Sequence, residues 1–508
     1  MHVFNENKPL VYTIKDRCRV CYTCVRECPA KAMKIINGQA EVIGDRCIAC
    51  GNCIKVCSQE AKAFHKSIED VQRLLNSDLK VIACVAPSFP AEFAEIGDHR
   101  IFIGMVKELG FDKVVEVSFG ADMVAKEYQK LVKKSQTRPI ITSDCPAIVF
   151  YIKHYHAELL PFLAPIVSPM VAISRVTKKQ YGTDNKIVFI GPCIAKKAES
   201  SEVDEVLTFS ELRKLFELNN ITPKKSLALD FDPPHSRKGA IFPVSRGLLE
   251  NLNQADSIIE GDTIVAEGKA KFLEVINELE KGNIRFKHME LLCCEGCIMG
   301  PGMSKSGKRL ERTHRISNYA KSKLESIPED EWEKQIENFK EVDFSQFFEP
   351  ADRRAPRPSE NVINNVLQKL GKFTPKDHLN CGACGYPTCI AHAVAIAEGL
   401  AEQEMCLPYT IEELHKSISD LNISNEKLAS AREALEQSEK LASMGQLSAG
   451  IAHELNNPLG VITLHSNILL NKMSDEDPAR ESLKLLVEQA DRCKNIVSGL
   501  LNFARKTM

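Results

Sequence analysis

Eight cysteines near the start of the chain constrain its fold more than any other feature. They form two runs with the same C-x2-C-x2-C-x3-C spacing, the first followed by Pro29 and the second by Ser58. The first run is Cys18, Cys21, Cys24 and Cys28, and the second is Cys47, Cys50, Cys53 and Cys57. Because the spacing is repeated, we interpret all eight as metal ligands rather than as packing residues.

Closely spaced thiolates of this kind are typical of iron–sulfur clusters. Three of them surround one corner of a cubic cluster, while the fourth reaches across to the other cluster. We therefore predict one 4Fe–4S cluster on Cys18, Cys21, Cys24 and Cys57, and a second on Cys47, Cys50, Cys53 and Cys28. Residues 1–70 resemble a bacterial two-cluster ferredoxin domain, which implies that they pass single electrons.

The length and charge of the chain limit its organisation and its partners. At 508 residues it is too long for one core, and length alone suggests three or four domains. A net charge of −2 gives no long-range attraction for nucleic acid or anionic lipid, so we expect neither nucleic acid nor membrane as a partner.

The start and the most apolar window of the chain argue against export or membrane insertion. The opening MHVFNENKPLVYT contains no uninterrupted apolar leader. The window Leu159–Ile173 is too short to span a bilayer and contains three prolines. We therefore predict a cytoplasmic protein, in which disulfides are rare and clustered cysteines are ligands or catalytic groups.

Residues 78–345 predict an α/β domain. Short apolar segments such as VIACVAP, KIVFIGP and AIFPV alternate there with amphipathic helical stretches. The cysteines of this region lie far apart, in loops that read TSDCPA (Cys145), GPCIAKKAE (Cys193) and LLCCEGCIMGPG (Cys293 and Cys297). Thiolates gathered from three distant loops suit a cluster enclosed within a domain.

These loops resemble the TSCCPxW, MPCxxKxxE and CxxxCxxGGG loops of the large subunit of iron–iron hydrogenases, over roughly residues 15–320. The resemblance implies that Cys145, Cys193, Cys293 and Cys297 hold the 4Fe–4S part of an H-cluster. Cys297 would also bridge to a dinuclear iron unit with carbon monoxide and cyanide ligands. The residues implied to line the dinuclear pocket are Lys196, Ser88, Ser168 and Pro87. Lys196 suits an anionic cyanide ligand as a compact cation with three donors, although an exposed lysine is the alternative interpretation.

Position 144 departs from the family pattern, because hydrogen-turning members place a proton-relaying cysteine where this chain has Asp144. A carboxylate can also carry a proton, but its reference pKa is about 3.9 against about 8.5 for a thiol. Burial would raise that pKa. Asp144 is therefore either a relay with a different resting state or a capping residue ahead of Pro146.

Four further departures alter the lining of the pocket while the cysteines remain: Ile148, Met170, Gly191 and Pro301. This pattern predicts a site that binds a cluster but is not tuned for fast turnover. Cys84 and Cys294 are interpreted as buried core thiols.

A third cysteine group follows the charged, proline-rich linker 346–360. Residues 361–410 contain Cys381, Cys384, Cys389 and Cys406. We expect Cys406 to lie at the end of an alanine-rich helix. The C-x2-C-x4-C-x16-C spacing resembles the small 4Fe–4S domain of corrinoid-protein subunits and of sensory hydrogenase-like proteins. Zinc is the competing metal for four thiolates. With this group, sixteen of the 19 cysteines divide into four 4Fe–4S clusters.

A heptad pattern occupies residues 411–440. Leu414, Leu421, Leu428 and Leu435 repeat every seven residues, and Ile411, Ile418 and Asn425 occupy the other seam position. Apolar heptads with one polar seam residue favour a parallel two-stranded coil, and we expect it to follow Cys406 after a short PYT turn. A monomeric surface helix is the alternative.

Residues 441–508 continue as SMGQLSAGIAHELNNPLGVI. Met444, Leu447, Ile451 and Leu455 share one helix face, and His453 lies roughly 200° round from Ile451, toward solvent. The HELNNP stretch resembles the H-box of histidine kinases. The resemblance implies that His453 accepts phosphate, that Glu454 is the polarising base, and that Asn457 orients water for phosphatase action.

A second helix is predicted over Glu481–Lys506, so that two chains would make a four-helix bundle. Pro458 would allow bending, and Cys493 is interpreted as a packing residue. The expected partners are a second copy of the chain, a response regulator, an electron donor or acceptor protein and, if the chain is complete, an ATP-binding kinase domain in trans.

The chain as a whole is thus predicted to be a multidomain α/β and α protein. Its domains are a ferredoxin-like two-cluster domain, an α/β H-cluster domain, a small helical 4Fe–4S domain, a coiled coil and a helical hairpin. The favoured function is a cytosolic redox or hydrogen sensor with a phosphotransfer output at His453. An active iron–iron hydrogenase whose helices only dimerise and a 4Fe–4S scaffold without the dinuclear unit are the alternatives. Slow or no hydrogen turnover is expected.

Overall fold

The computed structural model describes residues 9–134, 138–252, 263–284, 286–474 and 477–507. The chain separates into two compact units, Met1–Tyr409 and Thr410–Met508. The first eight residues of the predicted ferredoxin-like domain lie outside the described residues. No helix of the described chain is both long enough and apolar enough to cross a membrane.

The two-cluster domain is an internal duplication in structure as well as in sequence. Strand β1 (Val11–Thr13) pairs with β4 (Lys62–Phe64) and β2 (Met33–Ile36) with β3 (Gln39–Val42), both antiparallel. Each cysteine run winds around one short helix, α1 (Thr23–Glu27) or α2 (Asn52–Lys55). Left-handed backbone angles recur at matching places, at Val20, Tyr22 and Lys31 and then at Ala49, Gly51 and Glu60. The repeated backbone explains why the cysteine spacing is repeated.

The following domain contains two parallel sheets. One has the strand order β6-β5-β8-β9 and the other the order β10-β11-β7. The strands of the first are β6 (Lys113–Glu116), β5 (Val81–Val85), β8 (Lys186–Gly191) and β9 (Glu205–Thr208). Those of the second are β10 (Thr263–Glu267), β11 (His288–Leu292) and β7 (Ile140–Ile141). Parallel pairing explains why β5, and β8 after Lys186, are apolar, since both faces are buried.

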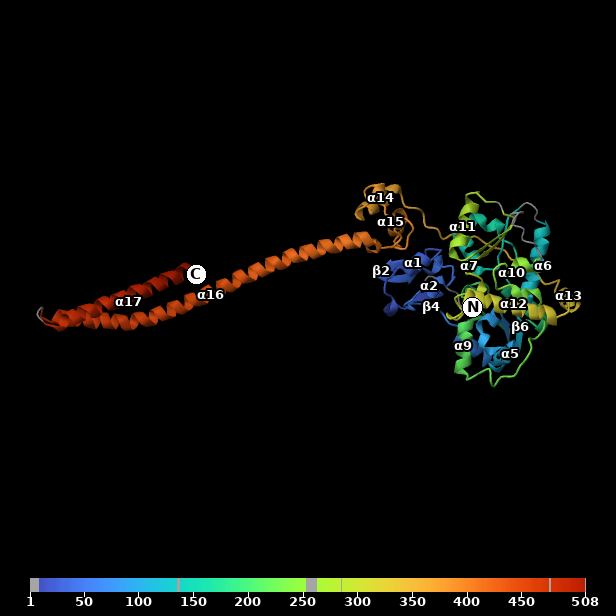
Figure 1. The fold of residues 1–508 in the computed structure, drawn as a ribbon, viewed down its shortest axis with the longest axis horizontal. Helices are drawn as coiled ribbons and strands as arrows, with labels where there is room; N and C mark the ends of the chain where they lie inside the picture. The colour runs from blue at the N-terminus through green and yellow to red at the C-terminus, as the bar shows by residue number, and fades with distance from the viewer. Residues whose placement is uncertain (1–8, 135–137, 253–262, 285, 475–476, 508) are drawn as a thin grey trace. The chain divides into compact units, whose positions relative to one another are not determined.

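Helices cover both sheets, as expected for an α/β domain (Figure 1). They are α3 (Ile68–Leu75), α4 (Phe89–Glu92), α5 (His99–Glu108), α6 (Val117–Lys134), α7 (Pro146–Tyr155), α8 (Pro169–Tyr181), α9 (Phe209–Leu218), α10 (Gly247–Asn251), α11 (Lys269–Glu280), α12 (Arg309–Ser326) and α13 (Glu329–Asn338). The expected strand at AIFPV is wrong: Lys238–Ile241 is a 3-10 helix, and Pro243 has no N–H to donate to a sheet.

The predicted linker 346–360 runs along the surface of α7. Ala351 N donates to Lys153 O at 3.1 Å and Arg353 N to His154 O at 2.8 Å. Beyond it, α14 (Glu360–Lys369) packs on α15 (Cys389–Ala397). The expectation that the alanine-rich helix reaches Cys406 is wrong, because the chain leaves the helix at Gly399, whose φ is +72°.

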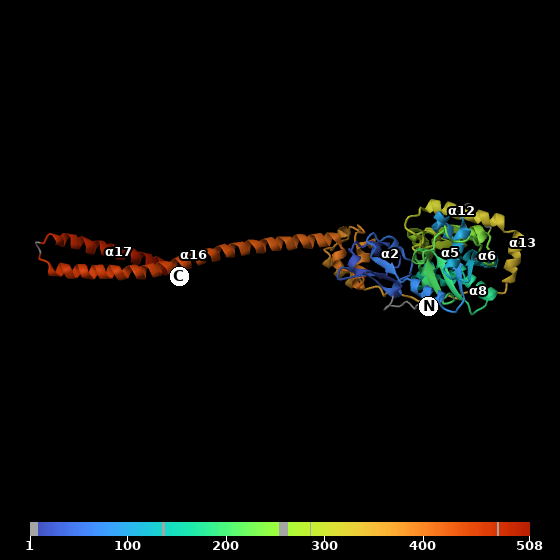
Figure 2. The same ribbon diagram turned by 90° about the horizontal axis from the view of Figure 1, so that it is seen from below.

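The second unit is helical. Helix α16 (Leu407–Lys472) begins directly after Cys406 and continues through Pro458. The PYT segment is therefore helical rather than a turn. Helix α17 (Ala479–Thr507) lies beside the later part of α16 (Figures 1 and 2). The predicted fold class, with α/β and ferredoxin-like regions followed by a long helical segment, is confirmed.

Candidate metal centres and phosphoacceptor helix

The eight cysteines of the first domain form two groups of four in the crossed arrangement that the spacing predicts. Burial raises the pKa of the Cys24 thiol, and Cys18, Cys21 and Cys57 lie close enough to raise it further, whereas Lys62 lowers it. Burial also raises the pKa of Cys53, to which Cys50, Cys47 and Cys28 add. Cys57 therefore lies with the first run and Cys28 with the second.

Backbone amides approach several of these sulfurs. Ala32 N donates to Cys28 Sγ at 3.3 Å and Ala61 N to Cys57 Sγ at 3.3 Å. In both bonds the donor amide lies four residues after the fourth cysteine of a run, so the bonds belong to the duplicated backbone. Such bonds stabilise anionic sulfur and tune the potential of a bound cluster.

In the α/β domain, strand ends bring the distant cysteine loops together. Cys145 follows β7 and is the N-cap residue of α7, and Cys193 follows β8. Burial raises the pKa of Cys145 to about 12, with Cys193 as the next contribution. Burial raises the pKa of Cys297 as well, and Cys193 and Cys145 add to it. The three thiols therefore face one another.

The two adjacent cysteines after β11 both have thiol neighbours. The Cys50 thiol and burial raise the pKa of Cys293, and Cys294 and Cys145 add to it. Burial raises the pKa of Cys294, and Cys193, Cys145 and Cys50 add to it. Both cysteines thus lie between the cage thiols and the two-cluster domain. The ligand role of Cys293 stays a prediction.

A cavity of about 50 Å³ adjoins this cage. Its lining includes Pro87, Ser88, Asp144, Met170, Cys193, Lys196 and Cys297. Ser168 precedes Pro169, which also lines the cavity. Pro87, Ser88 and Lys196 therefore lie around one cavity, whereas Ser168 is only adjacent to a lining residue, and their role toward a metal group stays a prediction.

The polar atoms of this pocket fit an anionic, hydrogen-bonding metal group. Ser88 and Ser168 are fully buried, and neither hydroxyl has a hydrogen-bond partner among the described residues. The Oδ1 atom of Asp144 also has none there. Buried polar atoms without partners are costly, so these three side chains have the capacity to bind a polar group.

Lys196 is buried rather than exposed. Its Nζ lies 2.7 Å from Glu199 Oε2 and donates to Asp144 O at 3.4 Å. Burial lowers the pKa of Lys196, but Glu199, Cys193 and Cys297 outweigh burial and raise it overall. The lysine therefore keeps its positive charge beside the cage.

Asp144 is enclosed, and its carboxyl faces the cavity. Burial raises the pKa of this carboxyl, whereas a hydrogen bond with Thr142 and the charge of Lys196 lower it. Helix α7 has Cys145 at its N-cap position and no side-chain capping bond there. The proton-relay role and the capping role of Asp144 both stay predictions.

The family departures have local causes. Met170 lines the cavity and Ile148 is fully buried in α7. A Cβ at Gly191 would lie 2.5 Å from the Phe189 ring, so the ring occupies the space of a larger residue. Pro301 packs on Gly51, where a Cβ would lie 2.6 Å from Pro301 Cγ. Pro301 thus belongs to the contact with the two-cluster domain.

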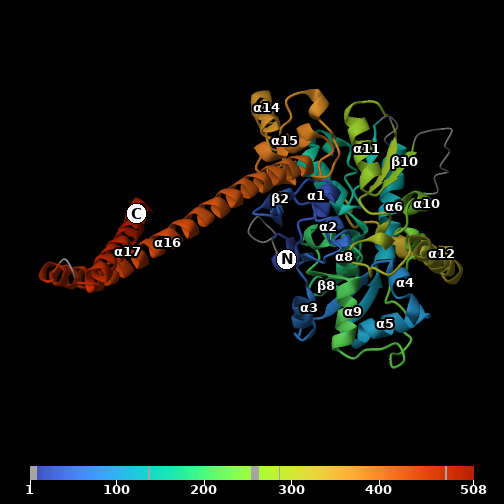
Figure 3. The same cartoon turned by 60° about the vertical axis from the view of Figure 1, so that its left-hand side comes forward.

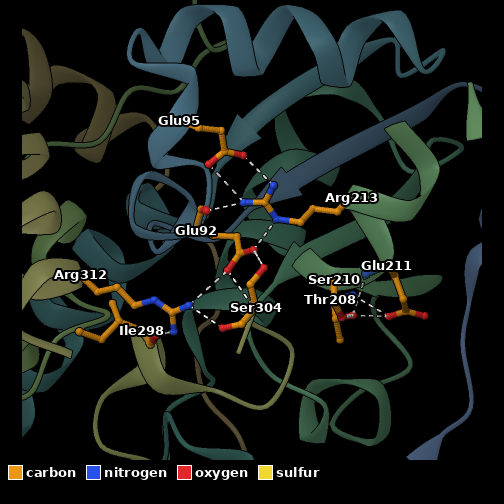
Figure 4. A network of polar contacts seen from close by, with 9 residues as sticks. All are labelled: Glu92, Glu95, Thr208, Ser210, Glu211, Arg213, Ile298, Ser304 and Arg312. Atoms are coloured by element: carbon orange, nitrogen blue, oxygen red, sulfur yellow. Dashed lines mark hydrogen bonds and ion pairs between the residues drawn. The ribbon is translucent and has the colours of Figure 1, made fainter. Parts of the chain in front are cut away.

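A buried polar network, which the sequence did not indicate, fixes the loop after Cys297 (Figure 4). The carboxylate of Glu92 accepts from Arg213 Nε at 2.6 Å and from Ser304 N at 2.9 Å. Arg312 donates to Ile298 O at 2.8 Å and to Ser304 O at 2.7 Å. The loop is therefore held between α4, α9 and α12, which sets the position of Cys297.

The third cysteine group also converges. Burial raises the pKa of Cys384, and Cys406 and Cys381 lie near enough to raise it further. Cys389 is the first residue of α15, and its N donates to Asn380 Oδ1 at 2.8 Å. Three of the four thiols thus lie close together immediately before α16, and the four-thiolate site stays a prediction.

The residues of the H-box are displayed on the surface of α16. His453, Glu454 and Asn457 are exposed. The apolar face beside them is also uncovered in a single chain: Met444, Leu447, Ile451 and Leu455 are between 45% and 64% exposed. An accessible imidazole and an uncovered apolar face suit phosphotransfer within a dimer.

Comparison with protein families supports these assignments segment by segment. Residues 79–301 match the family described as iron only hydrogenase large subunit, C-terminal domain. Residues 10–58 match a 4Fe-4S dicluster domain, and residues 377–408 a putative Fe-S cluster domain. Residues 443–508 match the His Kinase A (phospho-acceptor) domain, which implies dimerisation and a two-component system with a response regulator.

Similar proteins include an iron hydrogenase, an Fe-S cluster assembly factor and a sensor histidine kinase. Iron hydrogenase 1 of Clostridium pasteurianum is 30% identical over 282 residues, which is 46% of this chain and 49% of the relative. The cytosolic Fe-S cluster assembly factor NAR1 of Yarrowia lipolytica is 28% identical over 124 residues, 22% of this chain and 25% of the relative. The sensor histidine kinase RegB of Cereibacter sphaeroides is 33% identical over 81 residues, 16% of this chain and 18% of the relative.

This chain therefore spans at most about half the length of the curated relatives it matches. Its matched segments follow one another without overlap, so the hydrogenase-like and kinase-like regions are separate parts of one protein. The chain therefore joins a hydrogenase-like domain to two segments that match iron–sulfur domains and to a segment that matches a histidine kinase phosphoacceptor domain.

Proposed function

We propose that this protein is a redox or hydrogen sensor whose iron–sulfur clusters control phosphotransfer at His453. The observation that carries the proposal is the exposed His-Glu-x-x-Asn sequence of α16 on the same chain as the enclosed cysteine cage. A helix that served only for dimerisation would not need these three polar residues on its surface.

The proposed cofactors are four 4Fe–4S clusters, with a dinuclear iron unit in the cavity beside Cys297. When bound, the dinuclear unit would supply a site for the reversible cleavage of hydrogen. Ser88 and Ser168 would orient it through their unpaired hydroxyls, and Lys196 would supply a fixed positive charge. Asp144 would hold or release a proton at Oδ1, in the position where related enzymes use a thiol.

At the output, we assign phosphate transfer to α16. One ring nitrogen of His453 would attack the γ-phosphorus of ATP, forming the P–N bond as the P–O bond to ADP breaks. Glu454 would accept or polarise the ring proton. Asn457 would orient water for hydrolysis of the phosphorylated aspartate of a response regulator. The ATP would be presented by a kinase domain that these residues do not include.

Labelling at His453 tests this proposal. The reconstituted protein is incubated with labelled ATP and an added kinase ATP-binding domain, with its clusters reduced or oxidised. We expect labelling of the wild type that changes several-fold with cluster oxidation state, and none in His453→Gln. His465→Gln, an exposed histidine on the same helix, is the matched control and should label like the wild type. Labelling that persists without His453, or that ignores oxidation state, would contradict the sensor proposal.

A 4Fe–4S scaffold without the dinuclear unit is the second candidate. Asp144 in place of a thiol, the small cavity and the similarity to an Fe-S cluster assembly factor favour it. Infrared spectra of anaerobically matured protein decide between them, because carbon monoxide and cyanide stretches belong to the dinuclear unit alone. If the bands are present, Asp144→Cys should raise hydrogen evolution and alter its pH dependence, whereas Asp144→Ala should not.

A further inference from the structure

The Fe-S domain, residues 377–408, is docked on the two-cluster domain (Figure 3). Ile35 N donates to Leu400 O at 3.2 Å, and Asn37 N donates to Glu402 Oε1 at 2.7 Å. These bonds join the β2-β3 hairpin to the segment between α15 and α16. Two domains that are separated by more than 300 residues in sequence thus share a defined contact.

A second set of contacts lies between α1 and the first cysteine loop of the Fe-S domain. Arg26 Nη2 donates to Ala383 O at 3.2 Å. Gly385, with φ +88°, packs so closely that a Cβ would lie 3.0 Å from Arg26 N. The loop that carries Cys384 therefore sits directly on the two-cluster domain.

Lys31 and Tyr386 occupy the centre of this contact. Lys31 Nζ donates to Gly385 O at 2.9 Å and to Val25 O at 3.0 Å, and it lies 5.3 Å from the centre of the Tyr386 ring. Tyr386 is 5% exposed, and its hydroxyl has no partner among the described residues. Glu60, which holds the matching place in the second half of the duplication, is exposed and pairs with Lys305.

Both central side chains lie near a cysteine from each side. Burial lowers the pKa of Lys31, whereas the thiols Cys28 and Cys384 act to raise it. Burial raises the pKa of Tyr386, and Cys384 and Cys28 contribute in the same direction. Cys28 belongs to the group with Cys47, Cys50 and Cys53, so this group adjoins the Fe-S domain.

The same group adjoins the hydrogenase-like domain on another side. The Cys50 thiol acts on the pKa of Cys293, which follows β11 next to the enclosed cage. The Cys28 group therefore lies between the cage and the Fe-S domain. Cys21 of the other group is exposed, which leaves that group open to an external electron partner.

We propose that the Fe-S domain is the terminal electron acceptor of the chain and exchanges single electrons with the Cys28 group across the Lys31–Tyr386 junction. In the forward direction, a reduced cluster on Cys28, Cys47, Cys50 and Cys53 loses one electron, and an oxidised cluster on Cys381, Cys384, Cys389 and Cys406 gains it. No bond breaks and no proton moves. The proposal rests on the proposed function only in requiring a cluster in both groups.

The chemistry of the junction favours this role. Reduction adds one negative charge to a cluster, and a half-buried ammonium between two clusters stabilises that charge on either side. The unpaired Tyr386 hydroxyl can donate to a cluster sulfur, and such bonds raise cluster potentials. The accepting cluster then changes charge at Cys406, the residue directly before α16.

A redox titration followed by electron paramagnetic resonance tests the junction, with dithionite as the reductant and 4Fe–4S-reconstituted full-length protein. Signals are assigned with Cys28→Ser and Cys384→Ser. In Lys31→Met we expect the ratio of reduced to oxidised form of both clusters at a fixed potential to fall about tenfold, which corresponds to 59 mV for one electron. Lys34→Met, a half-buried lysine of β2 that pairs with Glu41, is the matched control and should shift less than twofold. A shift of one cluster alone, or of neither, overturns the proposal.

Electron arrival is tested by separating the domains. Gly385→Ala introduces both backbone strain and a clash with Arg26, whereas Gly382→Ala introduces similar strain with no atom nearer than 3.8 Å. After mixing with limiting dithionite, reduction of the Fe-S domain should be at least tenfold slower in Gly385→Ala than in Gly382→Ala. Amide exchange at Asn37 should be faster only in Gly385→Ala. Equal rates in the two variants overturn the proposal.

None of these measurements uses ATP, His453 or the dinuclear unit. Failure of phosphate labelling with an intact junction would therefore reject the sensor function alone. Loss of the junction effects with normal redox-dependent labelling would reject only the proposed electron route.

Discussion

The cysteine cage and the phosphoacceptor helix arrange their functional groups in opposite ways. Cys145, Cys193 and Cys297 follow strand ends and helix starts, and they are enclosed by the domain that carries them. His453 lies exposed on a helix whose apolar face is uncovered. The cage is therefore complete within one chain, whereas the phosphoacceptor helix needs a second helix pair to bury its apolar residues.

The largest expected effect concerns the uncovered apolar residues of α16. Leu435 is 61% exposed, and the coiled-coil prediction buries it against a second copy. Leu435→Asp removes about 2 kcal/mol of hydrophobic stabilisation of the dimer per chain. We therefore expect the dimer dissociation constant to rise on the order of 10³, measured by sedimentation equilibrium.

Gln437→Asp is the matched control, because it adds the same side chain two residues away on the outer face of the coil. Its dissociation constant should stay within about threefold of the wild type. Equal weakening by both substitutions would show that charge, and not the leucine seam, controls association.

A smaller effect, on the order of 10²-fold in the equilibrium constant of unfolding, is expected in the α/β domain that encloses the cage. Burial raises the pKa of Glu290 to about 8, with the charge of Asp144 as the next cause. Its Oε1 accepts from Arg246 N at 3.0 Å. The folded state therefore holds a proton that the unfolded chain has released above its own pKa of about 4.3.

The sign of the pH dependence follows from this difference. Because the folded pKa is raised, the stabilisation is fully present below about pH 4.3, is lost as pH rises, and is gone above about pH 8. Glu290→Gln should therefore flatten the decline in denaturation midpoint between pH 5 and pH 8. Glu295→Gln, an exposed neighbour, should leave the decline unchanged. A wild-type midpoint that does not fall over this range would contradict the prediction.

The two regions also differ in what the sequence could reveal. Short-range spacing was enough to predict the crossed ferredoxin groups, the third cysteine group and the exposed face of His453, because all three depend on local geometry. The network of Glu92, Arg213 and Arg312 was not predictable, since its members come from three distant helices and have no spacing signal. The strand expected at AIFPV failed because apolar residues around Pro243 bury well in a 3-10 turn.

Cys293 and Cys294 show where spacing stops being sufficient. Counting back from Cys297, the family loop assigns the ligand to Cys293. Both residues follow the end of β11 at Leu292, so strand alternation does not decide which of them faces the cage. Cys193 and Cys145 are the leading charges on Cys294, whereas Cys50 leads on Cys293 and Cys145 also acts on it.

The smallest predicted effect decides between these two cysteines. The wild-type chain should bind about sixteen irons after reconstitution, since each of four cubic clusters takes four thiolates. Because Cys193 and Cys145 are the leading charges on Cys294, we expect Cys294→Ser to lose about a quarter of the iron. Cys293→Ser should keep its iron and alter only the cluster beside Cys50, seen as a changed resonance signal of the Cys28 group. The reverse result would establish the family spacing, with Cys293 as the ligand and Cys294 as a packing thiol. Retention of all iron in both variants would show that either neighbour can complete the cage, and the enclosed site would then be less rigid than its burial suggests.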